Sequence, residues 1–302
     1  MIKRQFVGVE PNRETDIAKF FQNNLTEGQL QKLREFFSFP QRENEFTYKN
    51  NNHDVKDCLA YGYEQYQTIA NTKMLPNHGS FQVAFTIKNK IEKIVISETL
   101  LQIIKSSNPR PSGWPLWVVL QNSSDMDKRP QHYSDRWQAF IETPNALDFW
   151  MVTEQKCFYH YRALKDDLNG STTTQAKAVK LKEIDFVWQV EIICDAIATG
   201  LAFTKALVED ENTVLSFIFR WTGLRNRTLS SWAHPDRNIY CASKSNTDDY
   251  TCEVSIPINS TRENIVNYTY EVASNLFLIF GGYDRISRDT IAQIVILYLK
   301  WK

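Results

Sequence analysis

The chain has 302 residues, of which 42% are hydrophobic and 23% charged, and its 35 Lys and Arg side chains balance 35 Asp and Glu side chains. This composition is typical of a globular protein that forms one large domain or two ordinary ones. Zero net charge argues against a protein that binds nucleic acid over its whole surface, although it is compatible with a local basic patch. The sequence contains neither a dinucleotide-binding glycine motif nor a phosphate-binding loop.

The cysteine pattern and the apolar segments indicate where in the cell the protein is located. An odd number of cysteines without C-x-x-C spacing favours a reduced, intracellular protein over a secreted disulfide scaffold. Residues 1–16 lack the apolar segment of a signal peptide, and no run approaches 18 apolar residues. We therefore expect a cytoplasmic protein without a membrane span. The five cysteines are Cys58, Cys157, Cys194, Cys241 and Cys252.

Residues 1–111 are predicted to form an N-terminal region of helices and a hairpin. Two short helices within residues 16–40 are similar to a helix-turn-helix, but neither is rich in the Arg, Asn and Gln that base reading requires, so ordinary packing is favoured. The polar residues 41–57 are interpreted as a loop. The periodicity then predicts a helix over residues 58–69, paired strands over residues 81–87 and 91–96, and a helix that Ser97 caps.

The Pro-rich stretch at residues 108–111 is the best candidate for a boundary, so residues 112–302 are predicted to form a C-terminal α+β domain. The expected fold class is α+β, with several helices packed on an antiparallel sheet and a mixed helix and hairpin region at the N-terminal end. Strands are expected over residues 136–142, 148–152, 158–162, 214–220, 228–232, 238–243 and 250–256, and helices over residues 187–208, 261–280 and 288–301.

The most informative stretch is residues 214–232, which begins with the alternation of a strand that has one buried face. A basic turn follows, and residues 228–232 return as a second strand, which predicts a hairpin with tryptophans at its shoulders and arginines near its tip. Guanidinium groups beside indole rings suit phosphate contacts and base stacking. The alternative is a solvated tip with the tryptophans in the core. The candidate nucleic-acid-binding residues are Arg220, Trp221, Arg225, Arg227, Trp232 and Arg237.

Three acidic residues, Asp185, Glu191 and Asp195, are candidates for the carboxylates of a metal-dependent nuclease. Restriction-type nucleases place an acid before an E-x-K motif on a strand, and the lysine is missing here. Glu191 and Asp195 instead lie one turn apart on a predicted helix. Capping or solvated roles are therefore favoured, and neither a metal nor another cofactor is predicted.

Other polar residues carry weaker signals. His234 and Asp236 are close enough in sequence for acid–base chemistry, but no nucleophile is identifiable beside them, so a capped turn is favoured. Cys157 and His160 are three residues apart in a predicted strand, which places them on opposite faces and disfavours a shared metal site. The basic segment at residues 128–132 is either part of a binding surface or an exposed loop.

Several sequence blocks occur in a distinctive order: SGWPLWVVL, LDFWMV with FYHYRAL, VWQVEIICDAIATGLAFTKAL, FRWTGLRNRTLSSW, and a helix followed by SRDTIAQI. In this order, residues 94–300 resemble the C-terminal region of bacterial Schlafen-type proteins, which carry an AlbA-like N-terminal domain and are often named DNA-binding or ATP-binding regulators. The E-x-x-x-x-[ED]-[FY]-K signature of that domain does not occur in residues 1–111. The resemblance therefore implies kinship with the accessory part of those proteins, without their ATP binding or ribonuclease activity.

Together, the residues and the resemblance favour a non-catalytic regulatory or accessory protein that binds nucleic acid through the basic hairpin. One alternative is a protein–protein scaffold, as a homo-oligomer or as a subunit of a bacterial antiviral defence or regulatory complex. The other is a metal-dependent nuclease. The salt dependence of binding distinguishes nucleic-acid binding from the protein–protein scaffold, because phosphate binding weakens steeply with salt whereas an apolar interface does not.

Overall fold

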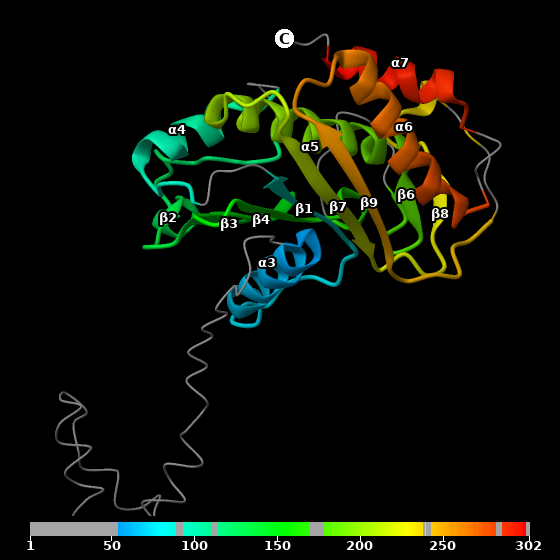
Figure 1. The fold of residues 1–302 in the computed structure, drawn as a ribbon. Helices are drawn as coiled ribbons and strands as arrows, with labels where there is room; N and C mark the ends of the chain where they lie inside the picture. Colours follow the sequence, from blue (N-terminus) through cyan, green and yellow to red (C-terminus); the bar gives the residue numbers. More distant parts are fainter. Residues whose placement is uncertain are drawn as a thin grey trace, which may run out of the picture. The chain divides into compact units, whose positions relative to one another are not determined.

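The computed structural model describes residues 54–88, 93–109, 114–168, 178–237, 239, 243–281 and 286–299 (Figure 1). The chain divides into two units, residues 1–51 and residues 52–302, and all described residues belong to the second. The two helices predicted within residues 16–40 therefore lie outside the described residues, as does most of the strand predicted over residues 238–243.

An antiparallel sheet of seven strands, in the order β2–β3–β4–β5–β1–β7–β9, forms the middle of this unit. Helices pack on the sheet, so the predicted α+β class is confirmed (Figure 1). The strands are β1 (Ser80–Lys88), β2 (Gln131–His132), β3 (Arg136–Thr143), β4 (Ala146–Thr153), β5 (Cys157–Ala163), β7 (Val214–Thr222) and β9 (Tyr250–Pro257). A separate pair consists of β6 (Glu183–Asp185) and β8 (Thr228–Ser230).

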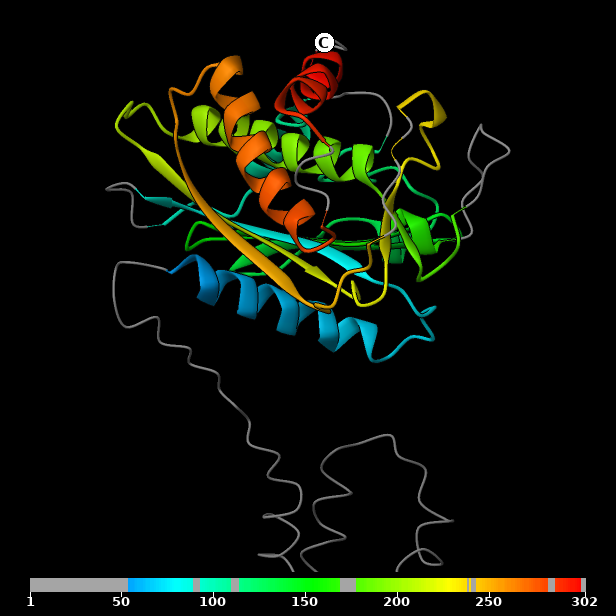
Figure 2. The same ribbon diagram turned by 90° about the vertical axis from the view of Figure 1, so that its right-hand side faces the viewer.

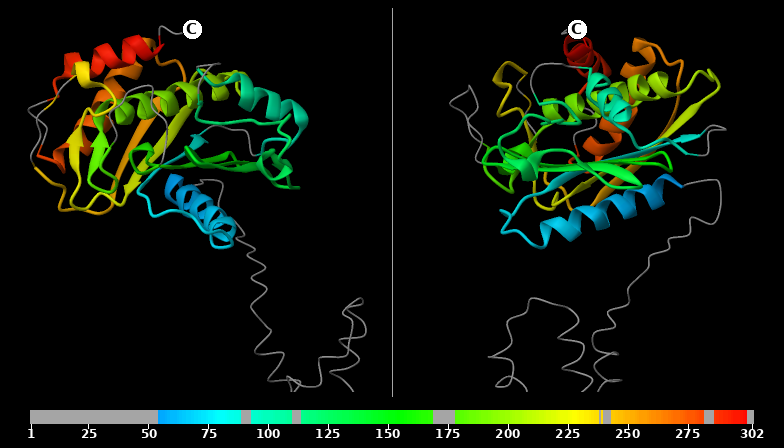
Figure 3. Two further views of the ribbon diagram at one scale, coloured as in Figure 1. Left: turned by 180° about the vertical axis from the view of Figure 1, so that it is seen from behind. Right: turned by 90° about the vertical axis from the view of Figure 1, so that its left-hand side faces the viewer.

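The helices cover both faces of the sheet, with α3 on one face and α4 to α7 on the other (Figures 1 and 2). The view from behind in Figure 3 shows the same layers. The helices are α3 (Val55–Ala70), α4 (Glu98–Ser106), α5 (Phe186–Leu207), α6 (Arg262–Leu278) and α7 (Arg288–Leu299). Short 3-10 helices are η3 (Met126–Lys128), η4 (Lys165–Asp167) and η5 (Pro235–Arg237).

Alternation along the strands decides which helices cover each side chain. In β7, Phe217 and Phe219 belong to the larger core under α5, whereas Ile218 belongs to the smaller core under α3. In β5, Phe158 belongs to the larger core and Cys157 to the smaller one. His160 follows Phe158 by two residues, so it lies on the face opposite Cys157, as the strand period predicted.

α5 is the central helix of the larger core. Asp185 caps its N-terminus, because the Asp185 carboxylate accepts hydrogen bonds from the backbone N–H groups of Val187 and Trp188 at 3.0 and 3.3 Å. Among the described helices it is the only one long and apolar enough to cross a bilayer, but 72% of its most apolar window is buried inside the protein. Its apolar sequence therefore matches its place between the sheet and the other helices.

The other helices predicted within the described residues are confirmed, and several have side-chain caps. Ser97 caps α4. At the start of α6, Thr261 and Asn264 form a reciprocal capping box. The Ser287 hydroxyl accepts a hydrogen bond from the Thr290 N–H at 3.2 Å at the start of α7. Such caps join neighbours in sequence, which is why the cap at Ser97 could be predicted from the sequence alone.

β1 pairs with other strands than the one predicted to follow it in a hairpin. Residues 93–96 are not a strand, and β1 instead pairs with β5 on one edge and with β7 on the other. All but the last residue of β1 are buried, and a buried strand requires hydrogen-bond partners along both edges. β1 precedes the Pro-rich stretch and both of its partners follow it, so residues on the two sides of the predicted boundary share one sheet.

The hairpin predicted over residues 214–232 does not form, which is a second correction. β7 pairs with β9, whereas β8 pairs in parallel with β6. The chain turns away after β7 at Gly223 and again at Asn226, whose φ angles of 70° and 65° are left-handed. The turn directs Arg227 into the interior, so β8 begins beside a different strand.

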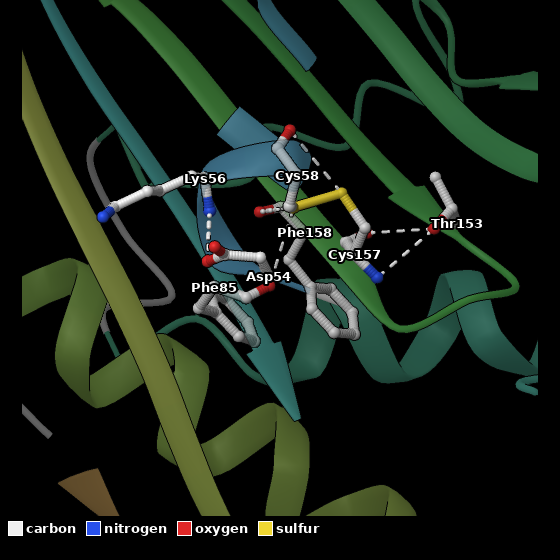
Figure 4. The surroundings of a disulfide bond; sticks show 7 residues. All are labelled: Asp54, Lys56, Cys58, Phe85, Thr153, Cys157 and Phe158. Carbon is white, nitrogen blue, oxygen red and sulfur yellow. Dashed lines mark hydrogen bonds between the residues drawn. A yellow bond between two sulfur atoms is a disulfide. The ribbon is translucent and has the colours of Figure 1, made fainter. Parts of the chain in front are cut away.

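Cys58 and Cys157 form a disulfide, which corrects the expectation of unpaired cysteines (Figure 4). Cys58 lies on α3 and Cys157 begins β5, so the bond ties α3 to the sheet. The two residues are 99 positions apart, and no short spacing reveals such a pair. Cys194 and Cys252 are free thiols.

Candidate functional site

A cavity of about 550 Å³, here named the α5 cavity, is lined by residues from β4, β5, α5 and α7. Its volume lies within the range of small-ligand sites. The lining combines charged and aromatic side chains, as ligand sites commonly do. The charged ones are Asp148, Arg162, Lys165, Glu191 and Asp195, and the aromatic ones include Trp114, Trp188 and Tyr298.

Asp148 and Arg162 form the charged floor of the cavity. Arg162 donates from Nε and Nη2 to the two carboxylate oxygens of Asp148 at 2.8 and 3.1 Å, and from Nη2 to the Pro115 carbonyl at 2.8 Å. The Trp114 indole N–H donates to the same carboxylate. Burial alone would lower the pKa of Arg162, but the charge and hydrogen bonds of Asp148 outweigh burial and raise it. The floor is therefore a pair of side chains held together by two hydrogen bonds.

His160 is a buried neighbour of this pair. Its Nε2 is 3.9 Å from Asp148 Oδ1, and neither ring nitrogen has a hydrogen-bond partner among the described residues. Burial, and secondarily the charge of Arg162, lower the pKa of His160 well below its usual value. The imidazole is therefore neutral at pH 7 and does not compete with Arg162 for Asp148.

Half-buried aromatic side chains gather around Trp188, which lines the cavity. The Trp188 and Trp232 rings meet edge to face with centroids 4.9 Å apart, and the Trp188 and His234 centroids are 6.1 Å apart. Lys165 Nζ lies 4.0 Å from the centroid of the Trp188 ring. Burial lowers the pKa of Lys165, although the charge of Glu191 acts in the opposite direction. We call Lys165, Trp188, Trp232 and His234 the aromatic platform.

The platform is positioned by buried carboxylates behind it. Asp185, which caps α5, also accepts hydrogen bonds from the Ala233 N–H at 2.9 Å and from His234 Nδ1 at 3.2 Å. The indole N–H of Trp232 donates to Asp166 at 2.8 Å. One aspartate thus fixes both the start of α5 and the turn that holds His234, which corresponds to the capped turn predicted there.

The structure does not bring the six predicted nucleic-acid-binding residues together. Arg220 pairs with Asp249 and lies 5.6 Å from the ring centroid of Tyr63 on α3. Trp221 is fully buried and donates from its indole nitrogen to Gln189 at 2.9 Å. Its side chain is therefore a core residue and is inaccessible to nucleic acid.

The remaining predicted residues have different surroundings. Arg225 is exposed, Arg237 is half-buried on η5, and Trp232 belongs to the aromatic platform. Arg227 is fully buried, so its prediction as a phosphate contact is wrong. Because the segment is a turn into a second sheet, its arginines point into different environments.

Arg227 binds Asp167 in the interior. Its Nη1 and Nη2 donate to the two Asp167 oxygens at 2.9 and 2.5 Å, and its Nε donates to the Gly223 carbonyl at 2.6 Å. Asp167 also accepts the N–H groups of Gly79 and Leu181 at 2.7 and 2.8 Å. This pair joins the start of β1, η4 and the turn after β7, so its role is structural.

Asp166 is a neighbouring carboxyl with a shifted pKa. Burial raises the pKa of Asp166 to about 6, and the charge of Asp185 adds to this effect, whereas the hydrogen bond from Trp232 opposes it. The folded state therefore holds this proton up to a higher pH than the unfolded chain does. Ionising Asp166 costs stability, and the cost develops as the pH rises from about 4 to about 6.

We expect Asp166→Asn to raise the free energy of unfolding at pH 7.5 by about 1–3 kcal/mol, because an asparagine oxygen still accepts both hydrogen bonds without the buried charge. The gain should vanish below about pH 3, where the wild-type carboxyl is protonated in both states. Urea unfolding of both proteins at a series of pH values measures this gain. Burial lowers the pKa of His160, so His160 changes stability with pH in the opposite direction, but it does so equally in both proteins and cancels in the comparison. A gain that is independent of pH would contradict this assignment.

The three carboxylates considered for a nuclease are divided between two roles. Asp185 is a helix cap, whereas Glu191 and Asp195 line the α5 cavity. The described residues contain no group of three His, Cys, Asp or Glu side chains suited to hold a metal ion. The favoured capping role is therefore confirmed for Asp185 only.

Sequence reasoning missed Asp148, Arg162, Lys165 and Trp188. One signal was available, since Asp148 and Arg162 are charged residues within otherwise apolar strands, where charges are usually paired. Comparison of the chain with protein-family models, with curated proteins and with solved structures finds no match.

Proposed function

We propose that this protein is a non-catalytic accessory protein that binds single-stranded nucleic acid at the aromatic platform. The observation that carries the proposal is the position of Trp188, which is half-buried, contacts Trp232, His234 and Lys165, and forms part of the wall of the α5 cavity. Partly exposed indole rings beside a cation are the elements on which bases stack without strong sequence preference.

The charge distribution supports single-stranded rather than duplex binding. The chain has zero net charge, so it lacks the surplus with which duplex binders neutralise many phosphates. Near the platform, Lys165 and the half-buried Arg237 supply cations for a few phosphates. Affinity would then come mainly from stacking, with a shallow dependence on salt.

The test is fluorescence anisotropy with labelled single-stranded DNA and RNA. Each base that stacks on an aromatic side chain contributes about 1–3 kcal/mol, so Trp188→Ala and Trp232→Ala should each weaken binding about 5- to 150-fold. Arg225→Ala is the matched control, because Arg225 is exposed and lies outside the platform. Loss of binding in Arg225→Ala with retention in Trp188→Ala would place the same function on the turn after β7. Absence of binding to any oligonucleotide would overturn the proposal.

A protein–protein scaffold is the second candidate. Leu278, Ile296 and Leu297 are each about half exposed on α6 and α7, with exposures of 49%, 46% and 50%. Exposed apolar residues on adjacent helices favour a protein partner or a second copy of the chain. A stoichiometric protein partner, or self-association of the chain, that persists at high salt without bound nucleic acid would support this candidate. Kinship with the accessory region of Schlafen-type proteins, proposed from the order of the sequence blocks, is compatible with both candidates.

A further inference from the structure

We infer that the α5 cavity accepts one unstacked nucleobase and selects a base that carries an exocyclic amino group. This inference rests on the proposed function, because it places a base from the bound strand behind the platform. Proteins that act on or recognise single bases read them in pockets, through stacking and hydrogen bonds to the base edge. The α5 cavity has the volume for such a group and an indole on its wall.

The cavity is unsuited to a phosphate. Three carboxylates, from Asp148, Glu191 and Asp195, line it against two cations, from Arg162 and Lys165. The guanidinium of Arg162 already donates to Asp148 and to the Pro115 carbonyl. Lys165 is exposed and lies over the Trp188 ring. A phosphate would therefore remain outside, near Lys165, while the neutral base enters.

The wall formed by α5 offers hydrogen-bond acceptors. Glu191 and Asp195 are four residues apart, so their side chains leave the helix on the same face, and both line the cavity. Each carboxylate oxygen can accept more than one hydrogen bond, so a further donor fits beside the existing partners of these side chains. Gln189, also on this wall, already bonds to Trp221. The acceptors on this wall therefore match a hydrogen-bond donor on the ligand.

Cytosine, adenine and thymine differ in whether they present a hydrogen-bond donor or an acceptor at one position of the base edge. Cytosine and adenine present an exocyclic amino group, whereas thymine presents a carbonyl oxygen at the equivalent position. Carboxylates accept from the amino group of cytosine and would face the thymine oxygen with like partial charge. One mismatched base contact typically corresponds to about a 5- to 150-fold difference in affinity.

The experiment measures binding of labelled dC, dA and dT oligomers of about 12 nucleotides at pH 7.5. We expect dC and dA to bind at least about fivefold more tightly than dT. Glu191→Gln introduces a donor of nearly the same shape and should bring the affinity for dT close to that for dC. Glu211→Gln, an exposed position beyond the end of α5, is the control and should leave the selectivity unchanged.

The outcomes separate this inference from the proposed function. Equal affinity for the three oligomers, lost in Trp188→Ala, would overturn the selectivity and leave the platform in place. Selectivity that Glu191→Gln leaves intact would overturn the assignment to the α5 wall. Absence of binding to all oligomers would overturn the proposed function and this inference together.

Discussion

Arg227→Met should lower the free energy of unfolding by about 3–5 kcal/mol, which is a large part of the stability of an ordinary domain. Arg227 and Asp167 are both fully buried, and the substitution leaves the Asp167 carboxylate without a counter-charge. It also removes the donors to the Gly223 and Glu183 carbonyls. The measurement is urea unfolding followed by tryptophan fluorescence and by circular dichroism.

Two further variants separate the buried charge from the lost side chain. Arg225→Met is the matched control, since Arg225 is exposed and two residues away, and it should cost less than about 0.5 kcal/mol. Combining Arg227→Met with Asp167→Asn removes the uncompensated charge and should recover part of the loss, also where Arg227→Met alone fails to fold. A cost below about 1 kcal/mol for Arg227→Met would show that the pair does not organise the turn.

The positions of the helices and strands were easier to predict from the sequence than the pairing of the strands. α5 and the strands β3, β4, β5, β7 and β9 follow from periodicity, because burial of one face imposes a pattern on neighbouring residues. The partner of a strand leaves no such pattern. β8 looked like the return strand of a hairpin, yet it pairs with β6, since Arg227 just before it binds Asp167, 60 residues away in sequence. An arginine in a turn has no local sign of burial.

The candidate site was only partly predictable for the same reason. Trp232 was identified because it stands in a basic, aromatic segment, but its neighbour Trp188 was hidden in an apolar helix. Asp185 brings the two segments together by capping α5 and binding the turn at His234. The floor pair of Asp148 and Arg162 likewise forms only once β4 and β5 align. Sequence shows the side chains, whereas the fold decides which of them share a cavity.

Loss of the Cys58–Cys157 disulfide should lower the free energy of unfolding by about 2–4 kcal/mol, because a bond that closes a loop of 99 residues restricts the unfolded chain strongly. The folded state should survive. α3 also packs through stacked Tyr66 and Tyr161 rings, whose centroids are 3.7 Å apart, and through Gly62, where a Cβ would lie 2.1 Å from the Tyr159 ring. A Cys58→Ala/Cys157→Ala variant, compared by thermal unfolding with Cys252→Ala, measures the effect. The double variant should unfold at a lower temperature with unchanged far-ultraviolet circular dichroism.

Counting the reactive thiols of the protein from its native host tests whether its compartment is reducing or oxidising. With Cys58 joined to Cys157, two fewer thiols should react with iodoacetamide after unfolding without reductant than after unfolding with reductant. Disulfides persist where the surroundings are oxidising, whereas cytosolic thiols are kept reduced. A deficit of two thiols would oppose the reduced location that the irregular cysteine spacing favoured. No deficit would mean that the two sulfurs lie side by side as thiols, and the stability difference between the double variant and the wild type would then shrink to that of losing two buried thiols.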